Sequence, residues 1–214
     1  MRTLVAVPCM DMVHTAFFKS AMDMRAVGEA QLAISASSLV YDARNALAAQ
    51  AIMGGFDRIL WLDSDMQFAP DIFERLSADM DEGREFVSGL YFTRRAPIKP
   101  VCYSYVGFRP EGEGIKPVAE AYFDYPKDSI FEVAGVGFGG VMMTVDLLKR
   151  VKAKFGLPFS PALGFGEDLS FCMRAAELGA KIYCDSRIKM GHAGLMTVTE
   201  ELYDETREHN AGAR

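Results

Sequence analysis

The chain has 214 residues, of which 50% are hydrophobic, 11% aromatic and 24% charged, and its formal net charge is −6. This length can bury a core without disulfides, and the composition excludes disordered, collagen-like and disulfide-scaffold proteins. The negative charge argues against a general nucleic-acid binder, because such proteins need a basic face. Four scattered cysteines lack a C-x-x-C pair, and no apolar run suits a signal peptide or a membrane span. We therefore expect a cytoplasmic protein without a transmembrane segment.

The first half of the chain alternates between strand patterns and helix patterns. Short apolar runs predict strands, in chain order, at 4–7, 30–35, 58–62 and 85–92. Apolar residues at helical spacing predict helices that begin near residue 12, span 43–53 and begin near residue 70. Gly54-Gly55 would end the second helix. Such alternation is typical of an α/β protein with a mostly parallel sheet flanked by helices.

The second half is less regular. Residues 96–125 are rich in Pro, Gly and Tyr and predict no clear element, whereas 130–145 predicts one or two strands interrupted by glycines. Helices are predicted over 146–155 and 168–178, followed by a short strand at 181–184. The tail at 196–214 is polar and predicts a final helix. One α/β domain is therefore expected over residues 1–195.

The sharpest feature is Asp63-Ser64-Asp65, which directly follows the apolar run Arg-Ile-Leu-Trp-Leu. In extended backbone, residues two apart project to the same side, so both carboxylates can face one cation. Open α/β sheets bind ligands at the carboxyl ends of their strands, and Mg²⁺ or Mn²⁺ favours such oxygen donors. The structural alternative is a strand that ends in a polar turn, where Asp and Ser are common.

A second acidic pair, Glu167-Asp168, opens a predicted helix. Acidic residues in a first helical turn are favoured by the helix dipole, which explains the pair without catalysis. The functional interpretation makes one carboxylate a general base that deprotonates an acceptor hydroxyl. Gly164 and Gly166, just before the pair, would let a substrate approach the backbone closely.

Histidine supplies one more candidate. A lone histidine is more often structural than a ligand, but His192 can complete a metal site with Asp63 and Asp65. A nitrogen ligand beside carboxylates would favour Mn²⁺ over Mg²⁺. His14 and His209 lie in segments without supporting signals, and we expect both to be structural or exposed.

Basic and aromatic side chains could contact substrate. Arg44 begins the helix before the Asp63 strand and can hold a diphosphate through its planar fork of donors. Arg94 and Arg95 can do the same, but solvated surface positions explain them better. An aromatic stretch can offer flat faces to an acceptor, although strand packing is the preferred explanation. Its members are Tyr91, Tyr103, Tyr105, Phe108, Tyr122, Phe123 and Tyr125.

Taken together, these motifs resemble GT-A-fold glycosyltransferases, most closely those of the family 2 type. The matching segments occur in the family's order over about residues 3–194. They are Val5–Pro8, similar to the opening strand; Ala43–Ala46, similar to the Ala-Arg-Asn segment near the nucleotide diphosphate; Leu60–Asp65, similar to the strand with its Asp-x-Asp; Gly139–Met143, similar to a glycine-containing wall of the substrate site; and Gly166–Ala175, similar to the Gly-Glu-Asp segment and its helix.

The resemblance implies a single Rossmann-like GT-A domain, with a nucleotide-binding half at about 1–95 and an acceptor half at about 96–195. It implies a nucleotide-sugar donor, most readily a UDP- or GDP-sugar, and an acceptor hydroxyl of unknown identity. Mn²⁺ or Mg²⁺ would be held by Asp63, Asp65 and His192. Asp168 would be the base of an inverting enzyme, with Glu167 as the neighbouring candidate. The implied donor-binding residues are Pro8, Arg44, Asp63, Ser64, Asp65, Gly139 and Gly140.

Three alternatives stay open at this point. A metal-binding histidine is also familiar from retaining GT-A enzymes, so His192 leaves the stereochemistry undecided. A sugar nucleotidyltransferase would use a similar metal-bridged nucleotide site, but the glycine-rich loop expected after its first strand is missing. A non-catalytic nucleotide-sugar-binding module would keep the fold without turnover, and the intact acidic residues argue against it.

Overall fold

The computed structural model of the protein describes residues 1–162 and 164–194, so the predicted tail helix and His209 lie outside the described residues. The strands are β1 (Arg2–Cys9), β2 (Glu29–Ala36), β3 (Arg58–Leu62), β4 (Met66–Gln67), β5 (Phe86–Leu90), β6 (Cys102–Glu111), β7 (Gly114–Ala121), β8 (Ile130–Val133), β9 (Gly135–Val136), β10 (Gly140–Thr144), β11 (Ile182–Lys189) and β12 (Gly191–His192). The helices are α1 (Thr15–Asp23), α2 (Val40–Met53), α3 (Ile72–Asp81), α4 (Val145–Phe155) and α5 (Glu167–Glu177). Each helix predicted within the described residues is confirmed.

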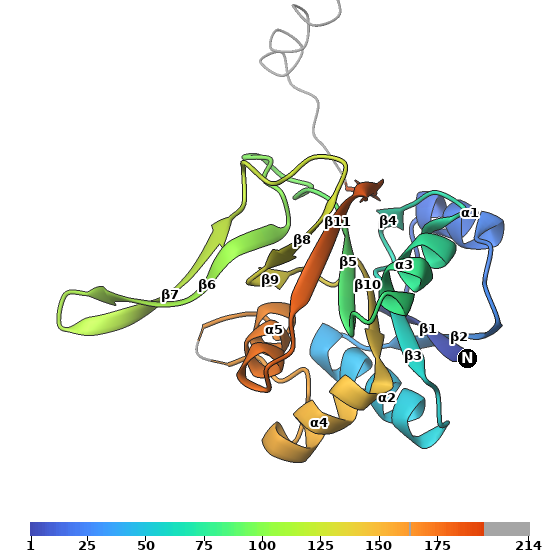
Figure 1. The fold of residues 1–214 in the computed structure, drawn as a ribbon, viewed down its shortest axis with the longest axis horizontal. Coiled ribbons are helices and arrows are strands. Elements are labelled where there is room, and N and C mark those ends of the chain that lie inside the picture. Colours follow the sequence, from blue (N-terminus) through green and yellow to red (C-terminus); the bar gives the residue numbers. More distant parts are fainter. Residues whose placement is uncertain (163, 195–214) are drawn as a thin grey trace, which may run out of the picture.

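Seven strands form the central sheet, in the order β2-β1-β3-β10-β5-β11-β8 (Figure 1). β1 pairs in parallel with β2 and β3, and β5 pairs in parallel with β11. β10 is antiparallel to both β3 and β5, and β8 is antiparallel to β11. Within this sheet, all strands except β10 and β8 therefore run in one direction, which confirms an α/β domain with a mixed but mostly parallel sheet.

Helices cover both faces of this sheet. α2, α4 and α5 pack on one face around a core that includes Trp61 and Phe138, and α1 and α3 pack on the other around Leu62 and Phe73 (Figure 1). Every residue of β3 is buried, because the strand lies inside the sheet with helices on both sides. The continuous apolar run that predicted a strand here is therefore confirmed as a buried strand.

Residues 96–125, which predicted no clear element, contain a β-hairpin formed by β6 and β7. β6 pairs antiparallel with β7 and, at its start, with β9, and the hairpin projects away from the body of the domain (Figure 1). Much of its length is solvent-accessible on both faces, so burial marks few of its residues. At its start, half-buried Tyr103 and Tyr105 flank exposed Ser104, which agrees with the strand packing preferred for these tyrosines. The segment 130–145 contains three strands, β8, β9 and β10, where one or two were expected.

The carboxyl ends of β1, β3 and β5 meet at one edge of the sheet, since these strands share a direction. Chain segments that leave this edge include Cys9, Asp63 and Tyr91. A two-stranded ladder of β4 and β12 lies at the same place, because β4 follows Asp65 and pairs with the strand that contains His192. Among the described residues, no helix is both long and apolar enough to cross a membrane.

Candidate functional site

A buried arginine joins the two acidic motifs of the sequence. Arg44 Nη2 lies 2.8 Å from Asp63 Oδ1, and Arg44 Nε lies 3.1 Å from Glu167 Oε1. These three residues are far apart in the chain, on α2, after β3 and at the start of α5. The fold therefore brings together the segments that the sequence treated as separate motifs.

The guanidinium of Arg44 lies against two aromatic rings. The residue is only 2% exposed, and its guanidinium carbon lies 5.2 Å from the ring centroid of Phe138 and 5.7 Å from that of Trp61. Burial alone would lower the pKa of the Arg44 guanidinium, but the charges of Asp63 and Glu167 outweigh it and raise that pKa. Its Nη1 atom is buried without a hydrogen-bond partner among the described residues. This atom is a buried donor that needs a partner, and a ligand could reach it only after a neighbouring group moves.

The Asp63–Asp65 segment is a turn rather than extended backbone. Met66 N donates to Asp63 O at 3.1 Å, which closes the turn between β3 and β4. The two carboxylates therefore have different protein partners: Asp63 contacts Arg44, whereas Asp65 contacts Arg94 and His192. Burial raises the pKa of Asp63 more than Arg44 lowers it. The sequence analysis expected both carboxylates to project to the same side because it assumed extended backbone at residues 63–65. The structure has a turn there instead.

Asp65 and His192 form the second half of the cluster. His192 Nε2 lies 3.5 Å from Asp65 Oδ2, and Ala193 N donates to Asp65 O at 2.8 Å. His192 Nδ1 lies 2.9 Å from Phe92 O, and since a carbonyl only accepts, this nitrogen carries the proton. Nε2 therefore faces the carboxylate. The hydrogen bond to Asp65 raises the pKa of His192, while the pKa of Asp65 is lowered by His192 and Arg94 against the effect of burial.

Glu167 and Asp168 differ in what they contact. Glu167 is engaged by Arg44, whereas Asp168 Oδ1 accepts a hydrogen bond from its neighbour Leu169 N at 2.7 Å. Burial and the charge of Glu167 raise the pKa of Asp168 to about 6. A pKa raised toward neutral pH suits a general base, and Asp79, outside this site, shares it.

Of the remaining candidates, Ser64 lies in the turn after β3 and Pro8 lies in β1. Pro8 is buried in β1 opposite Ser35, and Ser64 O accepts from His14 N at 2.8 Å. His14 caps α1 through Nδ1, which accepts from Ala16 N at 3.1 Å, so the structural interpretation of this histidine is confirmed. The predicted donor contacts of Pro8 and Ser64 stay predictions.

Side chains pack closely against two glycines, Gly139 just before β10 and Gly140 at its first position. A Cβ on Gly139 would lie 2.9 Å from both Met66 Sδ and Tyr91 Cζ, and one on Gly140 would collide with Met190. The backbone of Gly139 is also tied to the site, since its N–H donates to Tyr91 Oη at 3.2 Å and its oxygen accepts from Asp63 N at 3.2 Å. Contact of Gly139 and Gly140 with a donor stays a prediction.

Four carboxylates and two guanidiniums meet in this region, which leaves an excess of negative charge. The acids are Asp63, Asp65, Glu167 and Asp168, and the bases are Arg44 and Arg94. Within residues 1–162 and 164–194, no group of three or more His, Cys, Asp and Glu side chains is arranged as a complete metal site. Asp65 and His192 nevertheless present an oxygen and a nitrogen to the same space, which is a donor set suited to Mn²⁺.

A cavity of about 660 Å³ lies between the loop after β5 and the root of the β6–β7 hairpin. Thr93 and Tyr103 line it, together with Phe123, which is 60% exposed. Thr93 directly precedes Arg94, the partner of Asp65. Tyr103 pairs with Gly135, and a Cβ on Gly135 would lie 3.1 Å from the side chain of Leu169, the residue after Asp168. None of the four acidic residues is among those that line the cavity, but the charge of Asp168 is close enough to help raise the pKa of the lining residue Tyr103.

The sequence analysis considered two further residues of this site but did not assign them a contact. Arg94 is exposed, as the surface interpretation expected, and it also forms an ion pair with Asp65, which no local pattern indicates. Tyr91 packs its ring edge-on against His192, with centroids 5.5 Å apart, and receives the Gly139 N–H. Its position just after a buried strand, like that of Asp63, was the available signal.

No protein-family model matches the chain, and no curated protein matches it in sequence. Many solved structures are similar in fold, and two of them serve as examples. A197 from STIV has a TM-score of 0.60 at 18% identity, over 94% of this chain and 99% of that chain. GalNAc-T7, crystallised with UDP, GalNAc and Mn²⁺, has a TM-score of 0.57 at 12% identity, over 97% of this chain and 48% of that one. At these identities the likeness shows the fold alone, and that fold is a GT-A-type α/β domain; membership of the family 2 type is not confirmed.

Proposed function

We propose that the chain is a metal-dependent glycosyltransferase that moves a sugar from a UDP- or GDP-sugar to an acceptor hydroxyl. The single observation that supports this proposal most is the convergence of Arg44, Asp63, Asp65, Glu167 and Asp168 at the carboxyl edge of the sheet. A fold-level likeness over nearly the whole chain to GalNAc-T7, a protein crystallised with UDP, GalNAc and Mn²⁺, also supports it. The donor would lie against this edge, as ligands of open α/β sheets do.

The excess of carboxylates supports a divalent cation as cofactor. Asp65 and His192 would hold it, with Asp63 as a further oxygen ligand once its carboxylate turns from Arg44. Such a cation, when bound, would offset negative charge on the departing nucleoside diphosphate. Phe92 O fixes the proton of His192 on Nδ1, so the residue presents Nε2 to the site without rearrangement. A proton and a cation would compete for the Asp65–His192 pair.

Arg44 gives the site its other anion-binding group. Its Nη1 donor is buried and unpaired among the described residues, and its other two nitrogens are held by carboxylates. If a neighbouring group moves to expose Nη1, a diphosphate oxygen would satisfy it and relieve the cost of leaving a buried donor without a partner. The aromatic rings of Trp61 and Phe138 keep the guanidinium in place while the ligand exchanges.

Asp168 is the proposed general base of an inverting transfer. Its pKa of about 6 leaves it mostly ionised at neutral pH and able to take the proton of the acceptor hydroxyl. Glu167 is less suited, because its Oε1 is engaged by Arg44. The acceptor would enter through the cavity lined by Tyr103 and Phe123, whose rings offer it flat apolar faces.

A donor-turnover assay tests the base assignment. UDP or GDP release from UDP-glucose, UDP-N-acetylglucosamine and GDP-mannose would be measured for the wild type and for Asp168→Asn and Glu167→Gln. We expect Asp168→Asn to bind donor as the wild type does but to lose at least about a hundredfold in turnover, the usual contribution of a general base. Full turnover in Asp168→Asn with loss in Glu167→Gln would assign the role to Glu167.

A further inference from the structure

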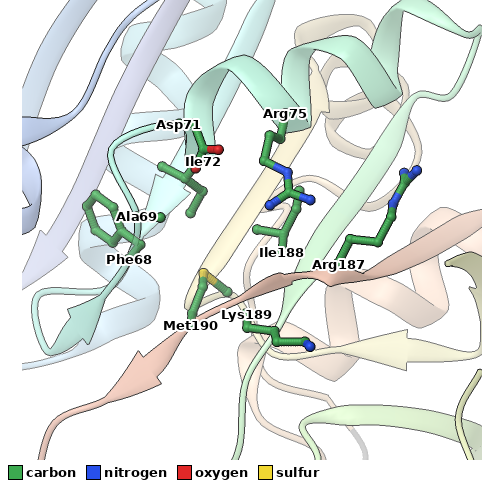
Figure 2. Close-up of a pocket in the computed structure, with 9 residues that line it drawn as sticks. All are labelled: Phe68, Ala69, Asp71, Ile72, Arg75, Arg187, Ile188, Lys189 and Met190. Atoms are coloured by element: carbon green, nitrogen blue, oxygen red, sulfur yellow. The ribbon is translucent and has the colours of Figure 1, made fainter. Parts of the chain in front are cut away.

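A second cavity lies away from the acidic cluster, between α3 and β11 (Figure 2). Its volume is about 230 Å³, or nearly eight times the roughly 30 Å³ that one water occupies in the liquid. The floor is apolar, formed by Phe68, Ile72, Ile188 and Met190, while Arg75 on α3 contributes a guanidinium and Asp71, before α3, a carboxylate that forms no ion pair with Arg75 among the described residues. This is too small for a nucleotide sugar and suits a small ligand with an apolar body.

Arg75 is the cation that the cavity leaves without a partner. Among the described residues, no ion pair or side-chain hydrogen bond involves its guanidinium, which extends from α3 toward Ile188 in Figure 2. The other two cations of the cavity are engaged elsewhere. Arg187 contacts Asp185 at 2.8 Å and Asp79 at 3.0 Å, and Lys189 lies 3.4 Å from Asp128. A half-buried, unpaired guanidinium above an apolar floor favours an oxyanion as its ligand.

The walls of this cavity continue directly into the β4–β12 ladder. Phe68 follows β4, and Met190 precedes β12. At the other ends of these short strands lie Asp65, just before β4, and His192, at the end of β12. A ligand that contacts both walls therefore holds the two strands that position Asp65 and His192.

We propose that this cavity is a second ligand site, which binds a small organic anion with an oxyanion head on Arg75 and a short aliphatic body on the apolar floor. Occupancy stabilises the β4–β12 ladder and so fixes the spacing of Asp65 and His192. Binding and its effect on the ladder are independent of the proposed glycosyl transfer. A carboxylate and a phosphate ester share this chemistry, and the experiment separates them.

Calorimetric titrations with hexanoate, hexyl phosphate and hexylammonium test the site. We expect at least one of the two anions to bind and the ammonium not to bind. Arg75→Gln should weaken binding at least about tenfold, because it removes a charge-assisted contact. Lys152→Gln is the matched control, since it removes one positive charge from an exposed position on α4, on the opposite face of the sheet, and should bind like the wild type. Ala69→Phe, which fills the exposed rim of the cavity, should also prevent binding without changing the charge.

Hydrogen exchange tests the link to the ladder. The bound anion should slow exchange of the backbone amides of β4 and β12 in the wild type and not in Arg75→Gln. Equal binding of hexylammonium, undiminished binding to Arg75→Gln, or no binding of either anion at millimolar concentrations would overturn the site. Anion binding without any change in exchange at β4 and β12 would overturn the coupling. A failure of glycosyl transfer would affect neither result.

Discussion

Asp168→Asn should stabilise the protein at alkaline pH while it removes the general base. Raising the pKa of Asp168 from 3.8 to about 6 corresponds to a cost of at most about 3 kcal/mol for keeping this carboxylate ionised in the folded state. Because the folded-state pKa is raised, the contribution of this carboxyl to stability is complete below pH 3.8 and is lost as the pH rises through about 6. Asparagine avoids the charge, and its Oδ1 can still accept the Leu169 N–H.

The stability gain should therefore depend on pH. Urea unfolding of the wild type and of Asp168→Asn should show a gain in unfolding free energy that reaches at most about 3 kcal/mol at pH 8 and about half of that at pH 5. Asp124→Asn, at an exposed position, is the matched control and should change little at either pH. A loss of stability in Asp168→Asn at pH 8, or the same gain at pH 5 and pH 8, would refute the argument that burial and Glu167 raise this pKa.

Three further changes test other parts of the structure. Arg44→Met should cost about 3–5 kcal/mol in urea unfolding, because Asp63 and Glu167 lose their buried partner. His192→Ala should weaken Mn²⁺ binding, measured by calorimetry, by about tenfold or more, because it removes the nitrogen ligand. Asp79→Asn should raise the unfolding free energy by an amount on the order of 1 kcal/mol at pH 8 and by less at pH 5. Burial and the hydrogen bond with Asp185 raise the pKa of Asp79 to about 6, so the stabilising contribution of this carboxyl is lost above that pH.

Each of these predictions has an outcome that contradicts it. A stability change below about 1 kcal/mol in Arg44→Met would mean that the Arg44 ion pairs act like exposed ones. Unchanged Mn²⁺ affinity in His192→Ala would remove this residue from the metal site. Equal effects of Asp79→Asn at pH 5 and pH 8 would mean that the pKa of its carboxyl is not raised to about 6.

The sequence predicted the elements that pattern alone determines. β3 was readable because both faces are buried, which makes its five residues continuously apolar apart from Arg58. α5 was readable because acidic residues open it and Gly179 follows its end. The β6–β7 hairpin was not predicted, because it projects from the core and most of its residues are half-buried or exposed.

The candidate site shows the same division. Asp63, Asp65, Glu167, Asp168 and His192 were found from motifs, but their partners were not. The contact of Arg44 with both acidic motifs depends on the placement of α2 against α5 and β3, which no local spacing determines. The turn that separates the Asp63 and Asp65 carboxylates depends on the β4–β12 ladder, whose second strand lies more than a hundred residues later in the chain.

Donor binding with and without Mn²⁺ tests the proposed function most directly. Thermal unfolding of the wild type and of Asp65→Ala would be followed with UDP-, GDP-, ADP- and TDP-sugars, because a ligand that binds only the folded state raises the unfolding temperature. The proposal predicts that at least one of these sugars stabilises the wild type only when Mn²⁺ is present, and that Asp65→Ala loses this effect. Equal stabilisation without Mn²⁺, or undiminished stabilisation of Asp65→Ala, would contradict a metal-dependent nucleotide-sugar site at Asp65.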